Sequence, residues 1–211
     1  MADTLTFYTN PMSRGRIIRW MLEELGHPYE TVVLDYASTM KGAEYLKINP
    51  MGKVPAIKHG DTVVTEGAAI CAYLADAFPQ ANLAPPHGSK DRGPYYRWLF
   101  YAAGPVEAMT SNHAAGWVPT PERQRMFGYG SREQVLDTLE QAVTGREFIA
   151  GNAFSAADVY FGSHIGWGLQ FGTLEKRPAY EAYVGRLMSR PAAVRAREID
   201  DALIAAAQKA S

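Results

Sequence analysis

Segments with strand-like and helix-like patterns alternate over the first 80 residues, whereas beyond residue 93 only helical patterns remain. The intervening segment "PQANLAPPHGSKDRG" is rich in proline, glycine and polar residues, a composition typical of a linker between domains. A chain of 211 residues is long enough for two small domains, each with its own core. The sequence therefore predicts an α/β domain over 1–80, a linker over 81–93 and an all-helical domain over 94–211.

The order of elements in the first domain is β-α-β-α-β-β-α. β-branched and apolar runs predict the strands, and apolar residues at helical spacing predict the helices. Gly26 supplies a stop for the first helix, and Gly60-Asp61 has the spacing of a hairpin turn. The expected strands are 5–8, 29–35, 54–59 and 62–66, and the expected helices are 13–26, 41–48 and 67–78.

Helical spacing and Pro/Gly punctuation predict further helices at about 94–112, 121–145, 155–171, 178–190 and 192–208. Ser155 and Asp158 have the spacing of a capping box, in which each side chain bonds the other residue's backbone. We assign this pair to folding of the helical domain. The glycines of "GWGLQFG" (166–172) lack the preceding strand of a dinucleotide-binding loop and are attributed to close helix packing.

Charge and residue usage exclude several classes of function. Lys plus Arg total 21 and Asp plus Glu total 22, without basic runs, so neither a nucleic-acid partner nor a membrane is expected. The five histidines show no metal-ligand spacing, and no metal cofactor is predicted. The start "MADTLTFYTN" lacks the profile of a signal peptide, and the single cysteine, Cys71, excludes an internal disulfide framework. These features predict a cytoplasmic protein.

Two segments carry groups that suit a peptide-like ligand. In "NPMGKVPAI" (49–57), a proline inside a strand indicates either an edge strand or a cis Val54–Pro55 bond that would let a ligand pair with the Val54 backbone. In "TEGAAI" (65–70), Glu66 and Gly67 stand at a helix start, where free N–H groups suit a carboxylate. Glu66 could bind an ammonium group of the same ligand, or serve only as a capping acid.

A third segment, "FYTNPMSRGRIIRW" (7–20), places a serine where the first strand gives way to the first helix. Ser13 is either a helix cap or the group that holds a reactive atom of a ligand, and the two roles are compatible.

Together these segments, the linker, the helical remainder and "SAAD" (155–158) resemble the cytosolic glutathione transferases over nearly the whole chain, in a bacterial-like, serine-type form. The resemblance implies a thioredoxin-like domain followed by an all-helical domain that carries the hydrophobic substrate site. It also implies a homodimer in which glutathione, the co-substrate, attacks a small apolar electrophile. No metal is implied.

The resemblance implies roles for individual residues of the glutathione site. Val54 would bind the cysteinyl part through its backbone, with Pro55 as the cis proline, and Glu66 with residue 67 would hold the γ-glutamyl end. Most relatives have serine at the last position, and Gly67 keeps the backbone N–H but lacks the hydroxyl. Basic residues that often meet the glycyl carboxylate correspond to Lys41 and Lys53, although each could equally be a solvated surface lysine.

The resemblance also implies a hydroxyl donor that stabilises the glutathione thiolate near the first helix. Ser13 is the expected donor, with Tyr8 and Asn10 as rivals. Cys71 lies among apolar neighbours and is expected in the core. The candidate walls of the hydrophobic pocket, which are alternatively core residues, are Met12, Met109, His113 and Trp117.

The sequence thus predicts an enzyme that conjugates glutathione to an apolar electrophile. Two alternatives stay open: a non-catalytic protein that binds glutathione or hydrophobic ligands, and a glutathione-dependent peroxidase or isomerase on the same fold.

Overall fold

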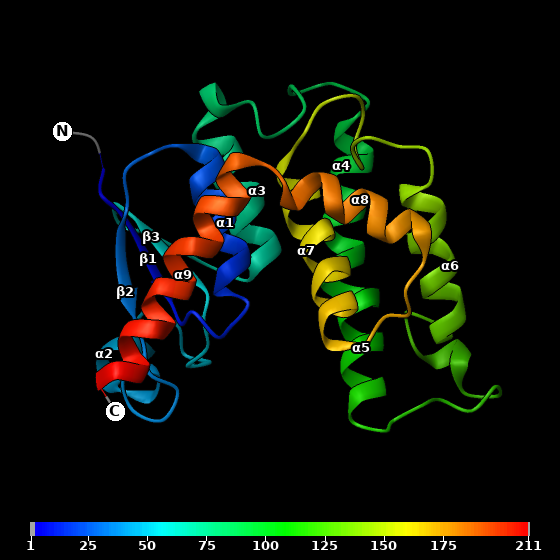
Figure 1. The fold of residues 1–211 in the computed structure, drawn as a ribbon, viewed down its shortest axis with the longest axis horizontal. Coiled ribbons are helices and arrows are strands. Elements are labelled where there is room, and N and C mark those ends of the chain that lie inside the picture. Colours follow the sequence, from blue (N-terminus) through cyan, green and yellow to red (C-terminus); the bar gives the residue numbers. More distant parts are fainter. Residues whose placement is uncertain (1–2, 211) are drawn as a thin grey trace. The chain divides into compact units, whose positions relative to one another are not determined.

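The structure is a computed structural model that describes residues 3–210. Its internal contacts divide the chain into two compact units (Figure 1), an N-terminal unit (Met1–Ala81 with Arg190–Ser211) and a helical unit (Asn82–Ser189). The first boundary falls at the start of the predicted linker. The last helix, which was predicted to lie in the helical domain, belongs to the N-terminal unit instead.

The N-terminal unit contains a four-stranded mixed sheet in the order β2-β1-β3-β4. The central strand β1 pairs parallel with β2 and antiparallel with β3, and β4 pairs antiparallel with β3. Burial alternates along β1, as expected for a strand with a different layer on each face. The strands, all close to their predicted positions, are β1 (Leu5–Thr9), β2 (Glu30–Val33), β3 (Ala56–His59) and β4 (Thr62–Thr65).

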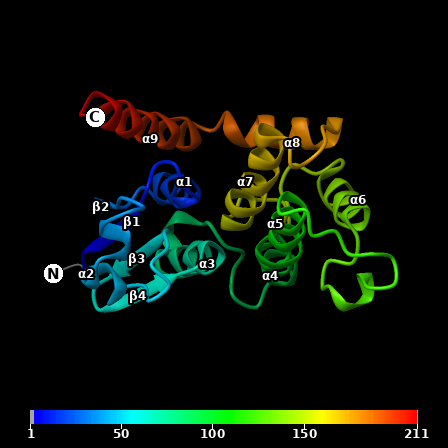
Figure 2. The same ribbon diagram turned by 90° about the horizontal axis from the view of Figure 1, so that it is seen from below.

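Helices α1 (Gly15–Leu25) and α3 (Gly67–Ala77) lie on one face of this sheet, and α2 (Ala43–Leu46) lies on the other (Figure 2). A 3-10 turn, Thr39–Lys41, precedes α2. Gly26 ends α1 as predicted: its φ is 65°, and its N–H donates to the Leu22 carbonyl. A sheet covered in this way is the thioredoxin-like arrangement that the sequence predicted.

The last helix, α9 (Pro191–Ala210), packs against α1. Arg19 of α1 is almost fully buried, lies over the ring of Phe7 at 5.0 Å, and bonds Asp200 of α9 at 3.2 Å. The helical pattern of α9 resembles that of its predecessors, but its charges match those of α1, which explains why it joins this unit. The ion pairs between α1 and the last helical segment are Arg16–Asp201, Arg19–Asp200, Glu23–Arg195 and Glu24–Arg190.

The helix predicted over 94–112 is present but changes character in the middle. A π-helical segment, Ala102–Val106, separates α4 (Arg92–Tyr101) from α5 (Glu107–Ala114). It contains Pro105, which has no N–H to donate and whose ring does not fit a regular helix interior. A widened turn accommodates such a residue without ending the helix.

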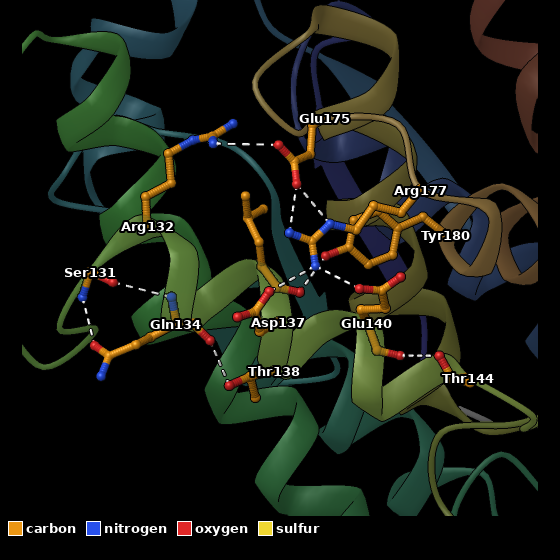
Figure 3. A network of polar contacts seen from close by, with 11 residues as sticks. Ser131, Arg132, Gln134, Asp137, Thr138, Glu140, Thr144, Glu175, Arg177 and Tyr180 are labelled. Carbon is orange, nitrogen blue, oxygen red and sulfur yellow. Dashed lines mark hydrogen bonds and ion pairs between the residues drawn. The ribbon is translucent and has the colours of Figure 1, made fainter.

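The helix predicted over 121–145 is much shorter, because α6 spans only Arg132–Val143. Gly130 adopts a φ of 67°, and Ser131 then forms a capping box with Gln134 that fixes the helix start. Figure 3 shows how α6 is held: Arg177 reaches across to Asp137 and Glu140 at 3.0 and 2.7 Å. The two following helices agree with their predicted ranges, α7 (Ala156–Phe171) and α8 (Pro178–Met188).

The predicted capping box of α7 is present and buried. Asp158 accepts hydrogen bonds from the N–H and hydroxyl of Ser155, from the Ile149 N–H and from the Tyr183 hydroxyl. Close packing accounts for Gly168, because a Cβ there would overlap Leu174, but not for Gly172, which has open space around it and ends α7 with φ 69°. Within residues 3–210, no helix is long and apolar enough to cross a membrane.

Candidate active site

The segments singled out in the first domain leave the sheet at one edge. Tyr8 of β1 lies opposite Ala56 of β3, and Ala56 lies opposite Thr65 of β4. The end of β1, the start of β3 and the end of β4 therefore lie at the same edge of the sheet. Thr9 and Ser13 follow β1, Val54 and Pro55 precede β3, and Glu66 follows β4. The register of the strands brings together groups that are more than 50 residues apart.

The end of β2 joins this edge through β1. Thr9 pairs with Val33, and the Leu34 N–H donates to the Thr9 carbonyl at 2.8 Å. The chain beyond Leu34 then forms a loop over 35–41, which Lys41 ties to the β3 side by donating from Nζ to the Gly52 carbonyl at 2.5 Å.

Ser13 lies at the start of α1 and is 8% exposed. Its Oγ accepts a hydrogen bond from the Gly15 N–H at 2.9 Å and donates one to the Asn10 carbonyl at 2.7 Å. The first turn of α1 reads Gly-Arg-Ile-Ile and carries no acidic residue. The serine oxygen therefore sits at a helix end whose partial positive charge favours a bound anion.

Gly15 permits this arrangement, and it was not among the residues predicted for the site. A Cβ at this position would overlap the buried Thr9 hydroxyl and would stand 3.0 Å from Ser13 Oγ. The available signal was a glycine inside "SRGR" at the first position of a helix, where glycine has poor helix propensity. The close contact between the helix start and β1 requires its missing side chain.

The Val54–Pro55 bond is cis, which is the second of the two alternatives that the sequence left open. Val54 is half-buried, and the pairing of β3 with β1 begins at Ala56. The main chain of Val54 thus lies at the site edge, just before the ladder starts.

Glu66 occupies the N-cap position of α3 with φ 67° and ψ 117°, a backbone conformation that residues other than glycine rarely adopt. Such a conformation costs about 1–3 kcal/mol and is concentrated at functional sites. The side chain is exposed, and the Ile70 N–H donates to the Glu66 carbonyl at 2.9 Å. The first turn begins with Gly67 and contains no acid.

Lys41 and Lys53 are both exposed, and they flank the segment 42–52, which contains α2. An ammonium group has three donors, so the bond from Lys41 to Gly52 leaves it capacity for a ligand. The Lys53 carbonyl accepts from the Tyr45 hydroxyl at 2.6 Å and from Asn49 Nδ2 at 2.8 Å, which fixes its backbone.

The rivals to Ser13 occupy different surroundings. The Tyr8 ring packs 5.6 Å from that of Tyr45, in the apolar cluster on the α2 face of the sheet. The Asn10 carboxamide bonds the Leu34 carbonyl and the Met12 N–H. Cys71 is fully buried, and burial raises the pKa of its thiol, so it is a core residue as predicted.

The four residues predicted for the hydrophobic pocket differ in exposure. Met12 is 69% exposed and follows Asn10 in the N-terminal unit. In the helical unit, Met109 is buried in α5, whereas His113 and Trp117, near the end of that helix, are exposed. Among residues 3–210, no group of three or more His, Cys, Asp or Glu side chains is arranged to hold a metal ion.

A thioredoxin-like unit joined in one chain to a helical unit is the architecture expected of the cytosolic glutathione transferases. Comparison with known proteins supports this class. Residues 12–77 match the description "Glutathione S-transferase, N-terminal domain", and residues 126–191 match "Glutathione S-transferase, C-terminal domain".

Individual relatives agree. The chain is 32% identical over 193 residues to the glutathione S-transferase GstA of Escherichia coli O157:H7, covering 87% of this chain and 90% of the relative. A glutathione transferase structure from Methylococcus capsulatus has a TM-score of 0.76 at 29% identity, with 94% and 99% of the two chains covered. A sphingomonad glutathione S-transferase complexed with glutathione has a TM-score of 0.75 at 30% identity, with 93% and 98% covered. The chain belongs to the glutathione S-transferase family, and thus to a family of transferases.

Proposed function

We propose that this protein conjugates the thiolate of glutathione to an apolar electrophile, and that Ser13 stabilises the thiolate. The observation that carries the proposal is the position of Ser13 Oγ at the open start of α1, on the sheet edge that also holds Val54 and Glu66. The similarity to a glutathione S-transferase solved with glutathione supports the choice of ligand.

The energy available at Ser13 is sufficient for this role. A free thiol has a pKa of about 8.5, and lowering it by one unit requires about 1.4 kcal/mol of preference for the thiolate. A hydrogen bond to a charged group contributes about 1.5–3 kcal/mol, and a helix N-terminus adds about 0.3–1 kcal/mol. Releasing the Ser13 hydroxyl from the Asn10 carbonyl costs about 0.5–1.5 kcal/mol. The balance lowers the thiol pKa by about one to two units.

The other groups on this edge would hold the peptide. The Val54 backbone pairs with the cysteinyl part, beside Pro55, and Glu66 with the Gly67 N–H holds the γ-glutamyl end. Lys41 and Lys53 attract the glycyl carboxylate. The missing hydroxyl at Gly67 removes one donor, so glutathione binds somewhat more weakly than it would with serine at this position.

Met12 of the N-terminal unit, next to Ser13 in the chain, has an exposed side chain that is a candidate contact for the electrophile. In the helical unit, His113 and Trp117 are exposed and stay candidate contacts, whereas Met109 is 1% exposed, as expected of a core residue. The active form would be a homodimer in the cytoplasm. Light scattering on the purified protein measures the oligomeric state directly, and a monomer at working concentration overturns the homodimer.

The test compares wild type and Ser13→Ala in conjugation of a chloronitrobenzene. We expect kcat/KM to fall about ten-fold or more, because about 1.4 kcal/mol of thiolate stabilisation is worth one decade in rate. The pKa of bound glutathione, followed by thiolate absorbance, should rise in parallel. Equal turnover by both proteins would reduce Ser13 to a cap. Absence of turnover in both, with binding to immobilised glutathione retained, would replace the enzyme by a glutathione-binding protein.

A further inference from the structure

The sequence Asn-Pro-Met occurs twice in the N-terminal unit, and both copies form the same turn. Asn10 Oδ1 accepts from the Met12 N–H at 2.9 Å, and the Asn10 carbonyl accepts from the Ser13 N–H at 3.0 Å. In the second copy, Asn49 Oδ1 accepts from the Met51 N–H at 3.1 Å, and the Asn49 carbonyl accepts from the Gly52 N–H at 2.8 Å. The copies differ in their fourth residue, which is Ser13 in the first and Gly52 in the second.

Each asparagine also donates a hydrogen bond through Nδ2, Asn10 to a segment 24 residues away and Asn49 to a residue only four positions on. Asn10 Nδ2 donates to the Leu34 carbonyl at 2.7 Å, and Asn49 Nδ2 donates to the Lys53 carbonyl at 2.8 Å. Asn10 is 9% exposed. The orientation of its carboxamide follows from its partners, because the Leu34 carbonyl requires a donor and the Met12 N–H requires an acceptor. Asn10 therefore holds the turn before α1 against the end of β2.

The first turn determines where the Ser13 hydroxyl stands. Its oxygen is fixed by the Gly15 N–H, and its proton is donated to the Asn10 carbonyl. To reach a thiolate, the hydroxyl must release that carbonyl. The carbonyl then still accepts from the Ser13 N–H, so the change leaves no buried group without a partner. A neutral hydrogen bond is exchanged for a charge-assisted one, which is about twice as strong.

From this geometry we infer that Asn10 is a positioning residue for catalysis: its carboxamide fixes the turn so that Ser13 Oγ meets the glutathione sulfur. The inference rests on the proposed role of Ser13 and assigns Asn10 an indirect role instead of the direct donor role that the sequence had left open. Asn49 closes the same turn through its Oδ1 and its carbonyl, in a copy without a hydroxyl and without a bond to a distant segment, and it therefore provides a control for loss of the turn alone.

The experiment measures the pKa of the bound glutathione thiol by thiolate absorbance at saturating glutathione. For Asn10→Ala we expect this pKa to rise by about one unit and kcat/KM at neutral pH to fall about ten-fold. Glutathione affinity should change less than about three-fold, because the peptide-binding groups lie on other loops. For Asn49→Ala we expect weaker affinity and an unchanged thiol pKa. An Asn10→Ala thiol pKa equal to that of wild type, or an equal rise in both variants, overturns the inference.

A double variant separates indirect from direct action. If Asn10 acts through Ser13, then Asn10→Ala in a Ser13→Ala background should leave the thiol pKa within about 0.3 unit of that of Ser13→Ala alone. A further rise of a full unit would mean that Asn10 itself contacts the sulfur. A wild-type thiol pKa in Ser13→Ala would refute the proposed role of Ser13, whereas a raised value there with no effect of Asn10→Ala refutes only the role of Asn10.

A conservative variant protects the test against simple misfolding. Serine can accept a hydrogen bond from the N–H two residues on, as asparagine does, but it is too short to reach Leu34. Asn10→Ser should therefore fold and show a thiol pKa between those of wild type and Asn10→Ala. Thermal melting checks folding of every variant, and a wild-type thiol pKa in a folded Asn10→Ser would contradict the need for the bond to Leu34.

Discussion

Two helices of this protein begin beside a buried serine, and the two starts are built differently. At α7, Ser155 faces Asp158, and the carboxylate binds the serine backbone and hydroxyl and two further donors. At α1, the residue three positions beyond Ser13 is Arg16, and the serine oxygen bonds only Asn10 and Gly15 among the described contacts. One helix end faces a carboxylate of its own chain, whereas the first turn of the other carries no acidic residue.

The two helix starts differ in more than the presence of an acidic residue. Absence of an acidic residue from the first turn does not by itself indicate a ligand site. The first turn of α4 also lacks one, and no site residue was predicted at its start. The start of α1 combines an open helix end with a buried hydroxyl on a fixed turn. The start of α3 combines an open end with the strained Glu66. The proposed difference in role between Ser155 and Ser13 thus follows the difference in what faces each serine.

The largest expected effect comes from removing the Asp158 carboxylate at the start of α7. Asp158→Ala would leave four buried donors without their acceptor, and we expect the free energy of unfolding to fall by about 3–5 kcal/mol. Chemical denaturation measures the change. Asp158→Asn keeps one carbonyl oxygen and should lose less.

The thiol pKa of bound glutathione provides the control for this prediction. Asp158 lies in the helical unit, and its hydrogen-bond partners Ile149, Ser155 and Tyr183 lie there too. Folded Asp158→Asn should therefore bind glutathione with the wild-type thiol pKa. A shifted thiol pKa, or a loss below about 1 kcal/mol in Asp158→Ala, would contradict the contrast between the two helix starts.

The fold could be predicted from the sequence wherever local signals agreed. Strand positions, the stop at Gly26 and the capping box at Ser155 follow from patterns within a few residues. The prediction for 121–145 failed because helical spacing continued across Gly130, and the box formed by Ser131 and Gln134 went unrecognised. The packing of α9 depends on charges of α1 some 180 residues away, and local periodicity carries no such information.

The site could be predicted only as a set of segments. The sequence indicated Ser13, Val54 and Glu66, but their common edge follows from strand register, which the sequence does not specify. The positive φ of Glu66 and the close approach at Gly15 are properties of the folded backbone. The proposed role of Asn10 had a visible signal in the repeated Asn-Pro-Met, although its bond to Leu34 is tertiary.

A second, smaller effect contrasts two thiols. The proposed site lowers the pKa of the glutathione thiol, whereas burial raises the pKa of the Cys71 thiol. Since the folded-state pKa is raised, the stability contributed by Cys71 is complete below its unfolded pKa of about 8.5 and is lost as pH rises above it.

This loss is measured against Cys71→Ala, which has no thiol to ionise. The difference in unfolding free energy between wild type and Cys71→Ala should shift against wild type by about 1.4 kcal/mol per pH unit above pH 8.5, or about 2 kcal/mol at pH 10. Denaturation curves at several pH values test it, and a difference that is constant with pH would contradict a buried thiol.

The smallest expected effect comes from adding an acidic residue to the first turn of α3. Ala69 is exposed in the first turn of α3, so Ala69→Asp places a carboxylate at the positive helix end. The helix should gain about 0.3–1 kcal/mol of stability, while repulsion of the γ-glutamyl carboxylate raises the KM for glutathione about two- to five-fold. Ala69→Asn controls for size and polarity, and added salt should reduce the difference between the two variants. Stability and affinity would then change in opposite directions at one residue, as expected if the fold leaves this helix end open for the ligand. An increase in stability with an unchanged KM would instead show that the glutathione carboxylate binds elsewhere.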